Sequence, residues 1–199
     1  QGVPQDDKTA VNWYTLAAEQ GDARAQYALG LMYANGLGAQ QDDKTALNWY
    51  TLAAKQENAN AQYILGLMYA NGLGAPQDYK TAVKWYTLAA EQEYADAQFN
   101  LGLMYANGRG VPQDYKTAVK WYTLAAEQGF ARAQNNLGVM YGLGQGVKKD
   151  YVYGHMWGNI AASNGNENGG KLRDMVAKEM TPAQIEKAQE LARECVRKE

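Results

Sequence analysis

The chain has 199 residues, of which 46% are hydrophobic, and a formal net charge of −2. This hydrophobic content excludes a disordered chain, and the charge provides no general attraction to nucleic acid or anionic lipid. With one cysteine and one histidine there is no internal disulfide and no ordinary zinc site, so we expect no metal and no cofactor.

Within the opening residues 1–6, residues 2–6 match the inside of a later loop, residues 110–114. A start inside a repeated element indicates a trimmed or partial chain, from which a targeting segment can have been removed. No stretch approaches the roughly 18 apolar residues that a membrane span requires, so we expect no membrane insertion.

A 36-residue repeat runs through most of the chain. All five tryptophans recur at this step, at Trp13, Trp49, Trp85, Trp121 and Trp157. A Leu-Gly dipeptide that begins at Leu29 recurs at the same step, as does Tyr33. Such repeats are typical of helical solenoids, in which short amphipathic helices bury their apolar faces by stacking. The sequence therefore predicts an all-α solenoid of helix-turn-helix units.

The first predicted helix covers residues 7–20 and begins after Asp6, whose carboxylate can accept the free amide hydrogens of the first turn. Equivalent aspartates precede the corresponding later helices: Asp42, Asp78, Asp114 and Asp150. The predicted buried face carries Ala10, Trp13, Tyr14, Ala17 and Ala18. Because alanines allow helices to approach closely, we expect each tryptophan ring to fill the gap between layers. A ladder of Trp-Tyr pairs that stacks on carbohydrate or nucleic-acid bases is the less favoured alternative.

The next predicted helix covers residues 23–35, with copies at 59–71, 95–107 and 131–142. One face of this helix carries Ala25, Leu29, Met32 and Tyr33. Gly36 and Gly38 follow it and supply the left-handed backbone of a helix end. After a half repeat at 1–20, the units start near residues 21, 57, 93 and 129, and the predicted repeat domain covers residues 1–165.

Residues 166–199 are predicted as a degenerate repeat followed by a capping helix. Gly169 and Gly170 interrupt the pattern, and we expect a short helix at 171–180. Thr181 and Gln184 form a capping box for a helix at 182–198. The apolar side of that helix carries Ile185, Ala188, Ala192, Cys195 and Val196.

His155 lies in the preceding helix, at 151–164, where the other units have valine or leucine. This position favours a packed histidine over a ligand.

Across residues 1–165 the units resemble the Sel-one-like repeat (SLR) family, a branch of the tetratricopeptide superfamily. In one unit the match rests on Ala61, Leu65, Gly66, Tyr69, Gly72, Gly74, Asp78, Ala82, Trp85, Tyr86, Ala89 and Ala90. The resemblance implies a right-handed α/α superhelix whose concave face is lined by the first helix of each pair. It also implies an adaptor or assembly role and, in bacteria, a periplasmic or exported location.

Positions that differ between the units mark a candidate partner-binding surface, because residues that build the stack should be alike in every unit. On the first helix of each pair, the variable positions lie three and four apart, on a stripe away from Leu29 and Tyr33. The predicted residues are Arg24, Tyr27, Asn60, Tyr63, Ile64, Asp96, Phe99, Asn100, Arg132, Asn135 and Asn136. Aromatic anchors beside amides suit an extended peptide or a partner helix, with neutral drift on a solvated face as the alternative.

These observations favour a protein-interaction scaffold over an enzyme. An exported factor that meets a host through the same surface is one alternative. A hydrolase is less favoured, because no unit carries a nucleophile with its base, a metal cluster or paired carboxylates. Nucleic-acid binding through the tyrosines is not expected without net positive charge. The partner and the oligomeric state are left open.

Overall fold

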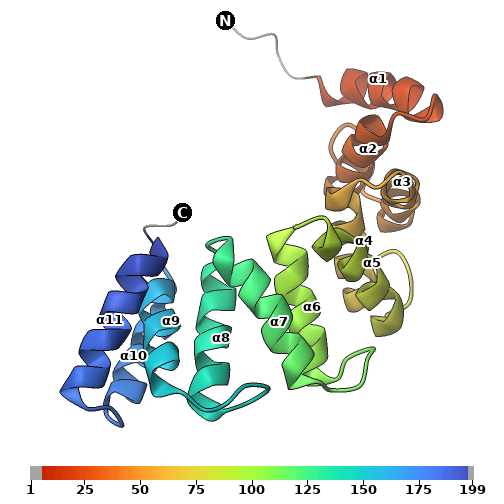
Figure 1. Ribbon diagram of the computed structural model, residues 1–199. Helices are drawn as coiled ribbons and strands as arrows, with labels where there is room; N and C mark the ends of the chain where they lie inside the picture. The colour runs from red at the N-terminus through yellow and green to blue at the C-terminus, as the bar shows by residue number, and fades with distance from the viewer. Residues whose placement is uncertain (1–5, 197–199) are drawn as a thin grey trace, which may run out of the picture. The chain divides into compact units, whose positions relative to one another are not determined.

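The computed structural model describes residues 6–196, with the backbone alone described for Val196. Residues 1–5 and 197–199, which include the loop-like start and the predicted end of the last helix, lie outside the described part, as does the side chain of Val196. The described residues form eleven helices and no strand. The helices are α1 (Asp7–Glu19), α2 (Ala23–Asn35), α3 (Asp43–Lys55), α4 (Ala59–Asn71), α5 (Tyr79–Glu91), α6 (Ala95–Asn107), α7 (Tyr115–Glu127), α8 (Ala131–Leu143), α9 (Tyr151–Ser163), α10 (Glu167–Ala177) and α11 (Pro182–Val196) (Figure 1). The predicted all-α repeat fold is confirmed.

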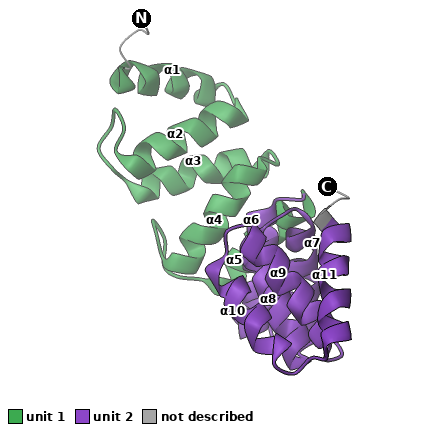
Figure 2. Cartoon of the chain, turned by 90° about the vertical axis from the view of Figure 1, so that its left-hand side faces the viewer, with its two compact units in different colours: residues 1–92 green, residues 93–199 purple. Residues whose placement is uncertain are grey.

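The helices fall into two compact units (Figure 2). Unit 1 is residues 1–92 and contains α1 to α5, and unit 2 is residues 93–199 and contains α6 to α11. In unit 1 each helix packs against the next along the chain. In unit 2 consecutive helices from α6 to α10 pack in the same way, and α9 also packs against α11. We call α2, α4, α6, α8 and α10 the first helices, because each occupies the first position of a helix pair.

Polar caps and glycines set the helix ends where the sequence predicts them. Asp42 accepts hydrogen bonds from the backbone amides of Lys44 and Thr45, at 3.0 and 3.2 Å. The Thr45 hydroxyl donates to the same carboxylate at 2.6 Å, and this bond is the main cause that lowers the pKa of Asp42. At the opposite end of a first helix, Gly36 adopts the left-handed conformation, with φ of 67°. These caps define the turn between the first and the second helix of a pair.

In the layers of α3, α5 and α7 the fully buried aromatic ring is a tyrosine. Tyr50 and Tyr86 are each 1% exposed, and Tyr122 is 2% exposed. Each ring lies against the glycine of the Leu-Gly dipeptide on the preceding helix. A Cβ atom added to Gly66 would come within 2.4 Å of the Tyr86 ring, so only glycine admits the ring in this position.

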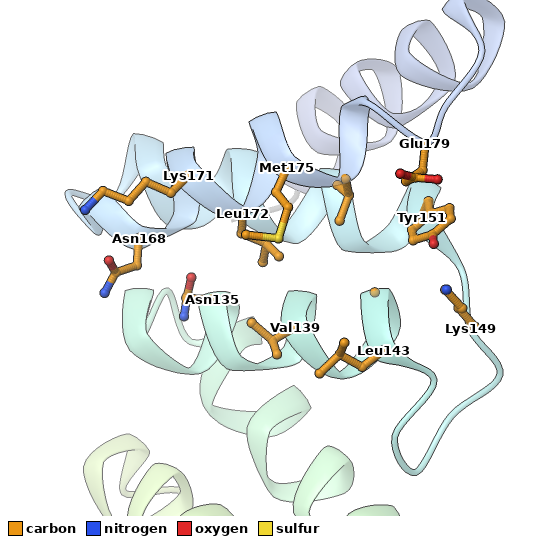
Figure 3. A pocket seen from close by; sticks show the side chains of 12 residues that line it. Asn135, Val139, Leu143, Lys149, Tyr151, Asn168, Lys171, Leu172, Met175 and Glu179 are labelled. Carbon is orange, nitrogen blue, oxygen red and sulfur yellow. The ribbon is translucent and has the colours of Figure 1, made fainter.

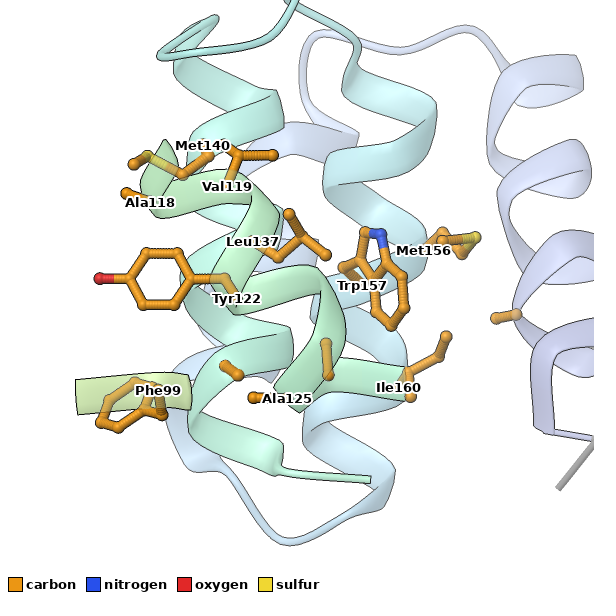
Figure 4. Close-up of a cluster of buried hydrophobic side chains, with 13 residues drawn as sticks. Phe99, Ala118, Val119, Tyr122, Ala125, Leu137, Met140, Met156, Trp157 and Ile160 are labelled. Atoms are coloured by element: carbon orange, nitrogen blue, oxygen red, sulfur yellow. The ribbon is translucent and has the colours of Figure 1, made fainter. Parts of the chain in front are cut away.

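The prediction that the tryptophans fill the interior between layers is wrong for Trp13 and is met only in part by Trp49, Trp85 and Trp121. Trp13 is 68% exposed, because no described helix precedes α1, and the neighbouring Tyr14 is also exposed. Trp49, Trp85 and Trp121 are half-buried. Trp49 and Trp85 do pack against apolar clusters of the preceding layers, but at their edges. Trp157 alone is buried, at 7% exposure, in the core of unit 2 (Figure 4).

Buried glutamines join successive layers by hydrogen bonds. Gln26 is 4% exposed, and its Nε2 atom donates to the carbonyl oxygen of Ala18 at 3.1 Å. Its Oε1 atom accepts a bond of 2.8 Å from Nε2 of Gln56. The pattern recurs with Gln62, which bonds Ala54 and Gln92, and with Gln134, which bonds Ala126 and Asn164. We did not predict this role, although the glutamine is identical in every unit.

Helix α10 takes the place of a further first helix. Its N-cap, Asn166, lies 36 residues after Phe130, the N-cap of α8. The prediction of a helix at 171–180 was wrong at both ends. The helix begins earlier, at Glu167, because Gly169 and Gly170 belong to it, and it ends earlier, at Ala177. A Cβ atom on Gly169 would lie 2.7 Å from the carbonyl oxygen of Gly158, so this glycine permits close packing of α10 on α9.

The predicted capping box at the start of α11 is confirmed by two hydrogen bonds between described residues. The backbone amide of Thr181 donates to Oε1 of Gln184 at 2.8 Å, and the Gln184 amide donates to the Thr181 hydroxyl at 3.4 Å. Ala188 and Ala192 are buried, as expected for a helix that covers the neighbouring α9. Cys195 packs at the edge of the same core.

Candidate functional site

In unit 1 the predicted partner-binding residues lie on α2 and α4. Arg24 and Asn60 are exposed, whereas Tyr27, Tyr63 and Ile64 are partly buried. The Tyr27 ring centre lies 5.8 Å from that of Tyr50, and the Tyr63 ring centre lies 6.2 Å from that of Tyr86. These two tyrosines therefore support the core on one side and reach the surface of the first helix on the other.

In unit 2 the prediction that Phe99 is an open aromatic anchor is wrong. Phe99 is 9% exposed, and its ring centre lies 5.9 Å from Tyr122 and 5.2 Å from Phe130. Phe130 occupies the N-cap position of α8 and makes no side-chain capping bond there, so its ring is free to cover Phe99. The other predicted residues of unit 2 remain accessible: Arg132 is exposed, and Asp96, Asn100, Asn135 and Asn136 are half-buried.

An open recess of about 790 Å³ lies between α8 and α10 (Figure 3). Val139 and Leu143 of α8 face Leu172 and Met175 of α10 across it. Leu143 and Met175 are 62% and 64% exposed, so the apolar walls are open to solvent. The other lining residues are Asn135, Gly142, Lys149, Tyr151, Asn168, Lys171, Val176 and Glu179.

A smaller recess, of about 280 Å³, occupies the equivalent place between α6 and α8. Seven of its lining residues lie 36 positions before residues that line the larger recess. The pairs are Leu103 and Val139, Ala106 and Gly142, Asn107 and Leu143, Tyr115 and Tyr151, Asn136 and Leu172, Val139 and Met175, and Met140 and Val176. The space between neighbouring first helices is thus a repeated feature, and in the larger recess two of its amide side chains are replaced by Leu143 of α8 and Leu172 of α10.

Gly158 distinguishes the layer of the larger recess, between α8 and α10, from the preceding layer. Tyr122 lines the smaller recess, and the residue 36 positions later is Gly158. A Cβ atom on Gly158 would already lie 3.0 Å from backbone atoms of α10. The glycine therefore removes a large ring from this layer and lets α10 pack directly onto α9. The Leu172 side chain lies against Gly138, where the earlier layers have the tyrosine ring.

Polar and charged side chains border the apolar walls. Asn168 and Lys171 lie at one end, and Lys149, Tyr151 and Glu179 lie at the other (Figure 3). The Lys149 Nζ atom is 4.6 Å from the centre of the Tyr151 ring, a cation–π contact. An apolar trough with polar ends is the usual arrangement of a binding site.

Two of the predicted residues line these recesses: Asn135 the larger and Asn136 the smaller. Leu172 and Met175 were missed because the chain after Gly165 lacks the Leu-Gly and tyrosine markers of a first helix. Leu143 was missed because the predicted helix ended at residue 142, one residue before the end of α8. The signal that could have found α10 is Asn166, a good capping residue at the expected 36-residue step.

His155 lies outside the recess and is a packed histidine, as predicted. It is 3% exposed, and its Nδ1 atom has no hydrogen-bond partner within residues 6–196. Burial is the main cause that lowers the pKa of His155, and the positive charge of Arg173 acts in the same direction.

Among the described residues, no three histidine, cysteine or acidic side chains are grouped to hold a metal ion. Within residues 6–196, no helix has the length and apolar character needed to cross a membrane.

The paired helices, the 36-residue step and the first-helix recesses define a helical repeat protein. The Sel1 repeat family matches five successive segments: residues 1–22, 23–58, 59–94, 95–130 and 131–166. The chain therefore belongs to the Sel1 repeat family, whose members are generally scaffolds for protein–protein interaction.

Solved structures support the same assignment. A Sel1 repeat protein from Oxalobacter formigenes is 39% identical, with a TM-score of 0.77 over 87% of this chain and 50% of that chain. A protective antigen with an SLR fold, present in uropathogenic Escherichia coli strains, is 28% identical, with a TM-score of 0.51 over 98% of this chain and 58% of that chain. This chain thus spans about half the length of these two proteins. A comparison with curated proteins finds no match.

Proposed function

We propose that this chain is a protein-interaction scaffold whose partner binds the surface formed by the first helices, with the recess between α8 and α10 as its main anchor point. The observation that carries this proposal is the exposure of Leu143 and Met175 on opposite walls of one recess. Apolar side chains gathered in an open depression mark interaction surfaces, whereas single exposed ones are ordinary.

The second helices of the pairs provide the contrast. Their exposed leucines occur one to a layer at the repeated position: Leu16, Leu52, Leu88 and Leu124. Each recurs with the 36-residue period and lines neither recess. The walls of the α8–α10 recess differ from the equivalent positions in the preceding layer, as a partner-specific surface should.

The remaining predicted residues extend the surface within each unit. On unit 1 we assign Arg24, Tyr27, Asn60, Tyr63 and Ile64 as further contact positions. On unit 2 we assign Asp96, Asn100, Arg132, Asn135 and Asn136, and we omit Phe99 because it is buried.

A pull-down from the native source tests the proposal, with the double variant Leu143→Asp/Met175→Asp as bait beside the wild type. Leu124→Asp is the control, since it places a negative charge at an exposed leucine of unit 2 outside both recesses. We expect at least one protein, quantified by mass spectrometry, to be retained by the wild type and the control and reduced about 10-fold or more by the double variant. If every captured protein is retained equally by all three baits, the recess is not the anchor point.

A second candidate function is an exported factor that meets a host through the same surface. The support for it is the relative described as a protective antigen of uropathogenic Escherichia coli strains. Protease treatment of intact cells of the native source, followed by immunoblotting, tests this idea. Full protection from protease until the cells are lysed would exclude exposure at the cell surface.

A further inference from the structure

The structure also indicates what kind of partner segment fits the α8–α10 recess, an inference that rests on the proposed function. We propose that the recess binds a short peptide segment of a partner protein in which two large apolar side chains are bordered by acidic residues. The length, the wall chemistry and the charges of the recess each support part of this assignment.

The length of the recess limits the segment to a few residues. Along α8 its wall runs from Asn135 to Leu143, which is roughly 12 Å at 1.5 Å per residue. That distance accommodates about two turns of a partner helix or about four residues of an extended chain. Either form places two side chains of the segment between the walls.

The walls select large apolar side chains. Leu143 and Leu172 stand where the preceding recess has Asn107 and Asn136, so two amide positions of that recess are apolar here. Met175 adds a flexible side chain that can adapt to the shape of an aliphatic or aromatic anchor. A polar segment would leave these apolar side chains without apolar contacts, whereas an apolar segment would remove them from water.

The charges at the two ends select acidic neighbours. Lys171 lies at the end with Asn168, and Lys149, preceded by the exposed Lys148, lies at the other end (Figure 3). Within the described residues neither Lys149 nor Lys171 takes part in an ion pair, whereas Arg173 pairs with Asp174. Glu179 offsets part of the positive charge at the Lys149 end, so the Lys171 end is the stronger site for a carboxylate.

Asn135 supports a peptide as the occupant. Its Oδ1 atom is buried and accepts no hydrogen bond within residues 6–196, while Nδ2 donates to Asn136 at 3.4 Å. Asn135 lies at the same end as Lys171 (Figure 3). A main-chain amide hydrogen of a bound peptide would provide the missing donor after a rotation of this side chain.

Selection from a displayed library of random peptides of about 12 residues tests the inference. The wild-type chain is the target, and peptides that also bind Leu143→Asp/Met175→Asp are removed. We expect the remaining peptides to carry two large apolar residues bordered by aspartate or glutamate. In fluorescence anisotropy, Lys149→Glu/Lys171→Glu should weaken the leading peptide about 5- to 20-fold, whereas the control Lys116→Glu/Lys120→Glu on α7 should leave its affinity unchanged.

The outcomes separate this inference from the proposed function. Apolar peptides without an acidic preference, or an affinity unaffected by Lys149→Glu/Lys171→Glu, would overturn the acidic assignment and leave the recess as an anchor point. If no selected peptide depends on Leu143 and Met175, the inference is wrong, and the pull-down decides separately whether the scaffold function stands.

Discussion

Gln56 donates a hydrogen bond of 2.8 Å from Nε2 to the Oε1 atom of Gln26, which lies 30 residues earlier in the chain. Because Gln26 also donates to Ala18, one buried amide connects α1, α2 and α3. The apolar contacts of these layers tolerate small displacements, whereas a hydrogen bond requires a defined distance and angle. Within each unit the glutamines therefore fix how far one layer is displaced along the next.

The substitution Gln62→Leu should destabilise the fold by about 1–3 kcal/mol. Gln62 is 3% exposed and bonds both Ala54 and Gln92, so leucine would remove one of the two donors to the Ala54 carbonyl oxygen and the acceptor of Gln92 Nε2. Urea unfolding followed by circular dichroism measures the change. The matched control is Asn60→Leu, at an exposed position of the same helix, which should change stability by no more than about 0.5 kcal/mol. Equal stability of the two variants would contradict the role assigned to the glutamine.

Glycine-to-alanine substitutions at Gly66 and Gly170 should have opposite effects. At Gly66 the added Cβ would lie 2.4 Å from the buried Tyr86 ring, which should cost about 1–3 kcal/mol. At Gly170, within α10, the nearest atom would be Ala162 Cβ at 3.9 Å, and alanine should stabilise the helix by about 0.5–1 kcal/mol. Thermal melting of both variants shows the two signs. A Gly66→Ala variant that melts no lower than the wild type would refute the packing described for Tyr86.

The tyrosine of each layer should contribute more to stability than the adjacent tryptophan. Tyr86→Ala should cost about 3–5 kcal/mol, because it opens a cavity at a position that is 1% exposed. Trp85→Ala should cost about half as much, since the ring is half-buried, and Trp13→Ala should be within about 0.5 kcal/mol of the wild type. Denaturant unfolding of the three variants gives the order. If Trp85→Ala were as damaging as Tyr86→Ala, the tryptophan would be the true interior residue.

His155 should make the stability depend on pH below about 6.5, its ordinary pKa. Burial, aided by Arg173 and opposed by Asp174, lowers the pKa of His155 in the folded chain, so the unfolded chain binds the proton more readily. The stabilisation is therefore complete above the ordinary pKa and is lost as the pH falls below it. In His155→Val, which carries the residue of the equivalent position in three other layers, urea unfolding between about pH 7 and pH 5 should vary less with pH than in the wild type. Parallel curves would show that His155 is not the group that titrates.

The helix boundaries were predictable because local chemistry sets them. Asp78 can cap a helix and Gly72 can end one whatever surrounds them, so the sequence alone locates both ends. The burial of Tyr86 instead of Trp85 was not predictable from the period, since both residues recur at the same step. A repeat shows which residues share an environment but not what that environment is. The glycine at Gly66, which leaves room for one ring, is the feature that distinguishes them.

The α8–α10 recess was hidden for a different reason. Leu143 and Met175 become neighbours only because α10 takes the place of a first helix, and its sequence has lost the residues that identify one. Asn135 could be found because it varies between units on a recognisable helix. The other wall required the position of α10 in space, which depends on close backbone packing at Gly158 and Gly169.

The glutamine bond reaches from one layer to the next and no further. An additional 36-residue unit inserted between two existing ones would therefore meet a donor on one side and an acceptor on the other, already in place. Duplication or deletion of a whole unit therefore requires no new kind of hydrogen bond between layers. Proteins of this construction can consequently lengthen or shorten by whole units without a change in the layer around α10.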